Sequence, residues 1–313
     1  MRHKERPLLF VDTNILLDFY RAASEKQLSL LRRLHEVTDS LITTDQVLME
    51  FCKNRQKVIG DYIGTLRVPD SIPLPGVLSE LRTMRTLNAD LKRARQKLGS
   101  LENRLLKMIE APSNHDPVFQ EVLRLFGTST NLSLSRSNPA RNRIRRLARK
   151  RFTLGYPPRK DSDTSMGDAI NWEWMIHCAT SNKRGLVIVS RDTDYGCIRK
   201  GETVINDWLR IEFRERVSKR RRITLTSSLS SALKQMSVQT TSKERQAESQ
   251  LVAPPLTLPS AAFLQKLAIG FPTLQPTGTE SSASPNPLRQ YMESANSRVW
   301  EEFIAWAEAH KKK

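Results

Sequence analysis

The sequence predicts an α/β fold with a central parallel sheet that is interrupted by a helical insertion. Short apolar runs alternate with segments of helical periodicity in residues 1–72, and the same alternation returns in residues 153–236. Strand, helix, strand and helix in succession are typical of parallel strands joined by crossover helices. The residues between these two segments show only helical periodicity and carry most of the excess positive charge. We therefore expect them to be inserted into one sheet domain.

The first part of the sheet domain begins with the apolar run Leu8–Val11, which predicts a buried strand. Apolar residues then recur at helical spacing in residues 15–34. Leu41–Ile42 is the second expected strand, and Thr43 and Thr44 are suitable N-caps for the helix that follows it. The order of these elements predicts two neighbouring parallel strands.

The insertion is expected to contain three helices. Apolar residues three and four positions apart in residues 84–108 predict a long helix with a heptad seam, and residues 117–126 predict a second helix. The third has Asn138 as its cap and Pro139 as its first residue. Residues 82–151 contain 17 Lys and Arg against 5 Asp and Glu, so this segment holds +12 of the chain's net +18. The charge is therefore concentrated on the helices.

The second part of the sheet domain opens with a helix that Thr164 or Ser165 can cap. The run Gly185–Ser190 is the clearest buried-strand signal of the chain, and shorter strands are expected at residues 203–205 and 223–225, each followed by a helix. In this second part, strands and helices alternate again, as in a parallel sheet with crossover helices.

Five segments follow from these patterns. They are a first core part (residues 1–72), a basic helical arm (73–152), a second core part (153–236), a linker rich in Pro, Ser and Thr (237–288) and a C-terminal amphipathic helix (289–313). The heptad seam of the arm and the C-terminal helix are each suited to binding a protein partner or a second copy of the chain.

Composition and charge narrow the class of protein. A net charge of +18 and a pI near 10.2 should attract polyanions, with nucleic acid as the leading partner. No apolar stretch approaches the ~18 residues of a membrane-spanning helix, so no membrane association is expected. The three cysteines lie far apart without a C-x-x-C pair, which indicates neither a disulfide framework nor a zinc site. A cytoplasmic location fits these features.

Acidic residues occupy comparable positions after the expected strands. Asp12 follows the first strand and Glu50 lies early in the helix after the second. Asp168 lies in the first turn of the helix after the insertion, and Asp192 and Asp194 follow the strongest strand. Because parallel strands end at one edge of a sheet, these acids are expected to converge there. Carboxylates without histidine or cysteine select Mg²⁺ or Mn²⁺ over zinc.

Each of these acids also has an ordinary structural explanation. Asp12 is a suitable helix N-cap, Glu50 could point to solvent, and Asp168 could complete a capping box with Ser165. Asp192 and Asp194 could be simple turn residues, and a basic helix is often only a solvated surface. Taken together, however, the structural explanations require four independent coincidences in the right order along an alternating fold.

Taken together, these residues resemble the PIN domain, a compact α/β nuclease fold related to the 5′-exonucleases. The resemblance rests on Leu8-Leu-Phe-Val-Asp-Thr-Asn14, the helical Glu50, Gly167-Asp168 and Val187-Ile-Val-Ser-Arg-Asp192. More narrowly, Gln46 to Arg55, Tyr156-Pro-Pro158 and Asn206-Asp-Trp-Leu209 resemble bacterial PIN-like proteins related to toxin ribonucleases. The resemblance covers about residues 7–72 and 153–236 and implies a three-layer fold. It includes neither the insertion nor the Pro-rich tail.

The resemblance also implies roles for individual residues. Asp12, Glu50, Asp168 and Asp192 would be catalytic and would hold Mg²⁺ or Mn²⁺, with Asp194 as an auxiliary ligand and Asn14 and Ser190 supporting them by hydrogen bonds. A nuclease core also needs cations that bind the phosphate backbone. The residues expected to do so are Arg55, Arg141, Arg143, Arg145, Arg146, Arg149, Lys150 and Arg191.

The function that the sequence favours is a metal-dependent endoribonuclease that hydrolyses single-stranded RNA or tRNA and leaves a 5′-phosphate. By family analogy it would be a toxin or defence effector held inactive by a partner. Two other hypotheses stay open. One is a nucleic-acid-binding scaffold with an inactive site, and the other is a nuclease of the same chemistry that cuts DNA.

Overall fold

The computed structural model describes residues 6–21, 26–68, 82–158, 165–199 and 202–252. Its centre is a five-stranded sheet in the order β3-β2-β1-β4-β7, and every adjacent pair is parallel. The strands are β1 (Leu8–Val11), β2 (Leu41–Thr44), β3 (Ser133–Leu134), β4 (Leu186–Val189) and β7 (Ile223–Thr226). The α/β class and the parallel sheet predicted from the sequence are confirmed.

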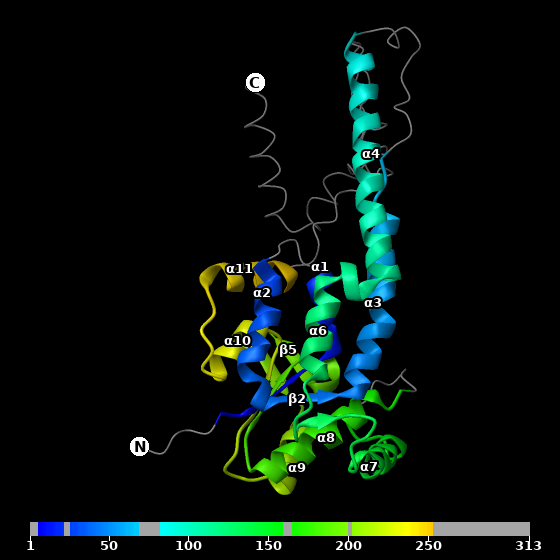
Figure 1. Cartoon of the computed structure of the whole chain (residues 1–313). Coiled ribbons are helices and arrows are strands. Elements are labelled where there is room, and N and C mark those ends of the chain that lie inside the picture. The colour runs from blue at the N-terminus through cyan, green and yellow to red at the C-terminus, as the bar shows by residue number, and fades with distance from the viewer. Residues whose placement is uncertain (1–5, 22–25, 69–81, 159–164, 200–201, 253–313) are drawn as a thin grey trace, which may run out of the picture. The chain divides into compact units, whose positions relative to one another are not determined.

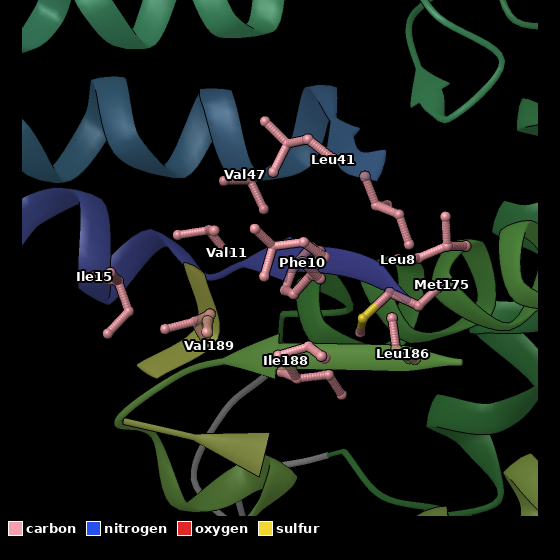
Figure 2. Packing of buried hydrophobic residues seen from close by; sticks show 14 of the residues in the cluster. Leu8, Phe10, Val11, Ile15, Leu41, Val47, Met175, Leu186, Ile188 and Val189 are labelled. Atoms are coloured by element: carbon pink, nitrogen blue, oxygen red, sulfur yellow. The ribbon is translucent and has the colours of Figure 1, made fainter. Parts of the chain in front are cut away.

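The core lies on both sides of β1 and β4. All eight residues of these two strands are buried, as expected for a parallel sheet covered by helices on both faces. Figure 2 shows Phe10 of β1 among Val47, Met175 and Ile188, which come from two helices and the neighbouring strand. Figure 1 shows α1, α2 and α6 on one side of the strands and α8 and α9 on the other.

The helices begin where the sequence offers caps. Thr44 Oγ1 accepts a hydrogen bond from Val47 N at 3.1 Å at the start of α3, and Asn206 accepts one from Trp208 N at 2.9 Å at the start of α9. The helices that cover the sheet are α1 (Thr13–Arg21), α2 (Lys26–Arg33), α3 (Asp45–Thr65), α8 (Gly167–Asn182), α9 (Asp207–Arg216) and α10 (Leu229–Gln235). The helical pattern expected over residues 15–34 thus corresponds to α1 and α2, followed by a 3-10 helix, Leu34–Ser40.

The strand expected at residues 203–205 does not join the main sheet. It is β6 (Glu202–Ile205), which pairs antiparallel with β5 (Gly196–Arg199) in a sheet of two strands. The main sheet instead contains β3, an edge strand that pairs with β2 and that the sequence did not predict. Its two residues lie inside the segment expected to be an arm.

Much of that expected arm belongs to the core. The long helix α4 (Arg82–Glu110) runs without interruption through Gly99 and has no buried residue. The rest of the segment comprises α5 (Pro112–His115), α6 (Pro117–Gly127), β3 and α7 (Arg141–Thr153). Val122 of α6 and Ile144 of α7 are fully buried in the main hydrophobic cluster. Among the described residues, the arm therefore reduces to α4, and the boundary expected after residue 152 divides a single core.

The linker expected after residue 236 begins with ordered structure. Residues 242–252 form helix α11 (Ser242–Val252), which contacts α2 and α10. Glu244 accepts hydrogen bonds from Arg33 Nε at 2.9 Å and Ser29 Oγ at 2.8 Å, and Glu248 accepts one from Ser228 Oγ at 2.8 Å. Buried carboxylates hold this helix in place, so apolar periodicity could not predict it. Residues 253–313, including the expected C-terminal helix, lie outside the described residues.

Glu244 makes the docking of α11 dependent on pH. Burial opposes its ionisation, but hydrogen bonds from Arg33, Thr241 and Ser29 outweigh burial and lower the pKa of Glu244 to about 2. Because this pKa lies below the value of about 4.3 in an unfolded chain, the stabilisation is present above pH 4.3 and is lost as the pH falls toward 2.

Replacing Glu244 with glutamine should therefore destabilise the protein by about 1–3 kcal/mol at neutral pH, and the difference from the wild type should shrink as the pH approaches 2. Urea titrations across this pH range measure the effect, and amide exchange in residues 242–252 localises it. Glu215→Gln changes an exposed carboxylate on α9 and serves as the control. A difference that stays constant with pH would contradict the assignment.

Across the described residues, no helix combines the length and the apolar character needed to cross a bilayer.

Candidate functional site

The candidate site lies where β1 and β4 end side by side. Asp12 directly follows β1, and its N–H donates to the carbonyl of Val189 at 2.9 Å. Ser190 directly follows β4, and its N–H donates to the carbonyl of Thr226 at 3.0 Å. The ladder therefore continues one residue past each strand and fixes these two side chains at the carboxyl edge, where parallel sheets bind their ligands.

Three donors hold the carboxylate of Asp12. Its Oδ2 accepts hydrogen bonds from Ser190 Oγ at 2.6 Å and Asn14 Nδ2 at 2.8 Å, and its Oδ1 accepts one from Thr13 N at 2.7 Å. Asn14 also donates to Ser190 Oγ at 3.1 Å. The structure thus places Asn14 and Ser190 against Asp12, where they fix its orientation.

Glu50 reaches the same edge from α3. Its Oε2 accepts a hydrogen bond from Thr13 Oγ1 at 3.2 Å, and its Oε1 accepts one from Gln46 Nε2 at 2.7 Å. A Cβ atom on Gly167 would lie 2.3 Å from Glu50 Oε1. A larger residue at position 167 would displace the Glu50 carboxylate from this position, and the approach of α8 places Asp168, the next residue, on the same side as Glu50.

Tyr195 lies beside Asp168 at the same edge of the sheet. Its side chain is fully buried, and its hydroxyl donates to Asp168 Oδ1 at 3.5 Å. Burial raises the pKa of Tyr195 well above 10, and the charges of Asp168, Asp12, Glu50 and Asp194 raise it further. Carboxylates from four separate segments of the chain are therefore close enough to act on one phenol. Sequence reasoning did not identify Tyr195, because nothing distinguishes it from a core tyrosine.

Asp192 and Asp194 lie on the segment after β4. Asp192 accepts a hydrogen bond from Thr193 N at 2.9 Å and thereby caps a short 3-10 helix, Thr193–Tyr195, while its own N–H donates to Ser190 Oγ at 3.0 Å. Asp194 is buried. Asp192 therefore has the structural role considered from the sequence and also lies beside the group that holds Asp12.

The site concentrates negative charge. Burial raises the pKa of Asp12 to about 6, hydrogen bonds from Ser190 and Thr13 oppose that rise, and the charges of Glu50 and Asp192 add to it. A bound cation would neutralise this repulsion. The donor set consists of carboxylate oxygens, so its chemistry fits Mg²⁺ or Mn²⁺.

The acids are neighbours, but they are not arranged as a ready-made cage. Within the described ranges, no group of three or more His, Cys, Asp or Glu side chains is placed to hold a metal ion. The side chains would have to adjust on binding, and Glu50 and Asp168 are only partly buried, which leaves them room to do so.

Basic residues of α7 lie beside the acids. Arg145, Arg146 and Arg149 line a cavity of about 540 Å³, and Gln46 and Gly167 line the same cavity. Gln46 donates a hydrogen bond to Glu50, and Gly167 lies against the Glu50 carboxylate. This cavity, here called the α7 cavity, therefore lies between the cations of α7 and Glu50.

The other expected cations of α7 are placed differently. Arg141 forms an ion pair with Asp45 at 2.7 Å, and Arg143 contacts His177 Nδ1 at 2.8 Å. Lys150 is exposed on α7. All three remain at the surface, although Arg141 has part of its charge neutralised.

Two arginines expected to bind nucleic acid have structural partners instead. Arg55 is 3% exposed and forms an ion pair with Asp116 at 2.6 Å, so it cannot reach a phosphate without exposing a buried carboxylate. Arg191 forms an ion pair with Asp18 and donates to the carbonyl of Ser227 at 3.3 Å. The expectation for Arg55 is corrected on this ground, and Arg191 has its charge neutralised by Asp18.

Comparison with known proteins gives one match. A family model described as PIN domain matches residues 9–195, more than half of the chain, and this range includes Asp12, Glu50, Asp168 and Asp192. No curated protein and no solved structure matches. PIN domains are generally metal-dependent nucleases that act on nucleic acids. The match and the carboxylates gathered at the edge of a parallel sheet agree, and the chain belongs to the PIN domain family.

Proposed function

We propose that the protein is a divalent-metal-dependent endoribonuclease that hydrolyses phosphodiester bonds of single-stranded RNA or tRNA in the cytoplasm. The observation that carries the proposal is the hydrogen-bond network at the carboxyl edge of the sheet, in which Thr13 donates to Asp12 and Glu50, Ser190 donates to Asp12, and the buried Tyr195 donates to Asp168. Such a concentration of carboxylates destabilises a fold unless a cation joins it. The neighbouring α7 cavity supplies positive charge for the phosphate backbone.

Asp12, Glu50, Asp168 and Asp192, with Asp194 as an auxiliary ligand, are the residues that would hold Mg²⁺ or Mn²⁺. When bound, such an ion lowers the pKa of a water molecule and stabilises charge on the leaving oxygen. Ser190 and Asn14 orient Asp12, and the hydroxyl of Tyr195 orients Asp168. Arg145, Arg146 and Arg149 would position the backbone next to the carboxylates.

Metal removal tests the chemistry. End-labelled single-stranded RNA, tRNA and single-stranded DNA are incubated with the protein in Mg²⁺, in Mn²⁺ or in EDTA. We expect RNA to be cut in either metal and to stay intact in EDTA. Cutting that survives EDTA would refute the metal mechanism, and preferential cutting of DNA would show that the substrate class is wrong.

A nucleic-acid-binding protein with an inactive site is the second candidate. It is favoured by the finding that the described acidic residues form no ready-made metal site. In the same assay this candidate predicts retarded RNA that is never cut in either metal. Its binding should persist in EDTA.

A toxin or defence role is a further part of the proposal and rests on the family alone. It predicts that expression of the wild-type chain arrests growth and that expression of an Asp12→Asn variant does not. Equal toxicity of the wild type and the Asp12→Asn variant would refute the toxin role without affecting the nuclease proposal.

A further inference from the structure

A second cavity lies beside β7, at the edge of the sheet. It has a volume of about 840 Å³ and is lined by β6, α9, β7 and the segment that joins α9 to β7. Five cations line it, Arg210, Arg214, Lys219, Arg221 and Arg222, against one carboxylate, Glu202. This cavity, here called the β7 groove, therefore holds an excess of four positive charges at neutral pH.

Much of this charge is available to a ligand. Within the described part of the chain, Arg214, Lys219 and Arg222 form no ion pair, and Arg210 forms only an exposed one with Asp207 at 3.6 Å. Clustered cations without carboxylate partners repel one another, so a polyanion would stabilise them. In this respect the groove differs from the positions of Arg55 and Arg191, where a buried or nearby carboxylate already neutralises the charge.

The groove ends at the candidate site. Thr226 lines the groove, and its carbonyl accepts a hydrogen bond from Ser190 N at 3.0 Å. Ser190 Oγ in turn donates to Asp12 Oδ2 at 2.6 Å. Two hydrogen bonds therefore connect the carboxyl end of β7 with the carboxylate at the end of β1.

The groove and the α7 cavity lie at different parts of the sheet. β7 is one edge of the sheet, beyond β4, whereas Gln46 of the α7 cavity follows β2, on the other side of β1. Asp12 and Asp192 follow the strands between them. The order from β2 to β7 is thus the α7 cavity, the carboxylates and the β7 groove. The groove runs along β7, with Arg221 and Arg222 toward the amino end of the strand and Thr226 at its carboxyl end.

We propose that the β7 groove binds the phosphate backbone of an RNA strand whose other side occupies the α7 cavity, so that the strand crosses the carboxylates. At about 3.3 Å per residue the four residues of β7 span about 13 Å, so a strand that follows β7 can contact the cations at its amino end and still reach Thr226 at its carboxyl end. This inference deepens the proposed function and rests on it for the path of the strand. Binding itself is measured without cleavage.

The test is a salt titration of RNA affinity in EDTA with Arg214→Ala/Lys219→Ala/Arg222→Ala. Each lost phosphate contact lowers the slope of log K against log salt by about 0.7 for a single strand, so three should lower it by about 2. Between 50 and 200 mM salt, the affinity of the wild type should then fall about 20-fold more than that of the variant. Fluorescence anisotropy of labelled single-stranded RNA provides the readout.

A matched control removes the same charge elsewhere. Lys53→Ala/Lys57→Ala/Lys243→Ala alters three exposed lysines on α3 and α11 and should leave the slope within about one phosphate contact of the wild-type value. Arg214→Lys/Arg222→Lys keeps the charge of the groove and should restore the wild-type slope. Circular dichroism shows that each variant is folded.

An unchanged slope in the groove variant, or an equal decrease in the control triple variant, would overturn the inference. The outcomes separate the two proposals. If the protein cuts RNA normally and its salt slope does not depend on the groove, the nuclease proposal stands and the groove proposal is refuted. If the groove binds RNA but the RNA is never cut in Mg²⁺ or Mn²⁺, the groove proposal stands and the nuclease proposal is refuted.

Discussion

Replacing Asp168 with asparagine should slow cleavage of RNA about a thousandfold and leave the fold intact. Loss of a cation's stabilisation of the transition state, worth about 4 kcal/mol, corresponds to about this change in rate. Asparagine keeps an oxygen that can accept the hydrogen bond from Tyr195, so the buried hydroxyl retains its partner. The substitution removes only the charge.

The stability of the Asp168→Asn variant shows whether the charge of Asp168 serves catalysis or the fold. Asp168, Asp12 and Glu50 all act on the Tyr195 hydroxyl, so they carry like charges in one region of the metal-free protein, and removing one of these charges should not cost stability. The free energy of unfolding in EDTA should therefore stay equal or increase, while the rate in Mg²⁺ falls. Single-turnover cleavage and urea denaturation measure the two quantities.

Asp61→Asn changes an exposed aspartate on α3 and is the matched control, which should cut RNA at the wild-type rate. An Asp168→Asn protein that cuts as fast as the wild type would show that Asp168 is not a ligand. A variant that is both inactive and strongly destabilised would instead assign Asp168 a structural role.

The sequence predicts the parts of the fold that local patterns determine. β1 and β4 are continuous apolar runs because both faces of a parallel sheet are covered, and Asn206 and Thr44 cap their helices through contacts within three residues. β3 has only two residues and pairs with a strand about 90 positions away. No local pattern encodes such a pairing, so the sequence predicts only helices in the segment that contains β3.

The same distinction holds at the candidate site. Asp12, Glu50 and Asp168 could be selected from sequence because each follows a strand or lies in the first two turns of a helix, and the carboxyl ends of parallel strands share one edge. Tyr195 could not, because its importance depends on the side chain that the fold brings against it, Asp168. Arg55 has the chemistry of a phosphate ligand, but its partner is 61 residues away and buried.

Arg55 yields the second large effect. Its Nε donates to Asp116 Oδ2 at 2.6 Å, and the side chains of this ion pair are 3% and 0% exposed. Tyr20 donates to the same oxygen at 2.7 Å, and Asp116 Oδ1 caps α6 by accepting from Phe119 N at 2.9 Å. Arg55→Met fills similar volume but leaves the charge of Asp116 buried without its cation, so the free energy of unfolding should fall by about 3–5 kcal/mol.

Urea denaturation of a double variant distinguishes this cause from a loss of packing. Arg55→Met/Asp116→Asn removes the uncompensated charge, so it should recover part of the stability that Arg55→Met loses.

Arg93→Met is the control for an exposed ion pair. Its partner Asp90 lies 3.2 Å away on α4, the side chains are 75% and 59% exposed, and the loss should be below about 1 kcal/mol. If Arg55→Met unfolds like the wild type and instead weakens RNA binding with a smaller salt slope, Arg55 is a phosphate ligand and the structural role assigned to it is wrong. If stability alone falls, the buried ion pair joins α6 to α3, the helix that carries Glu50.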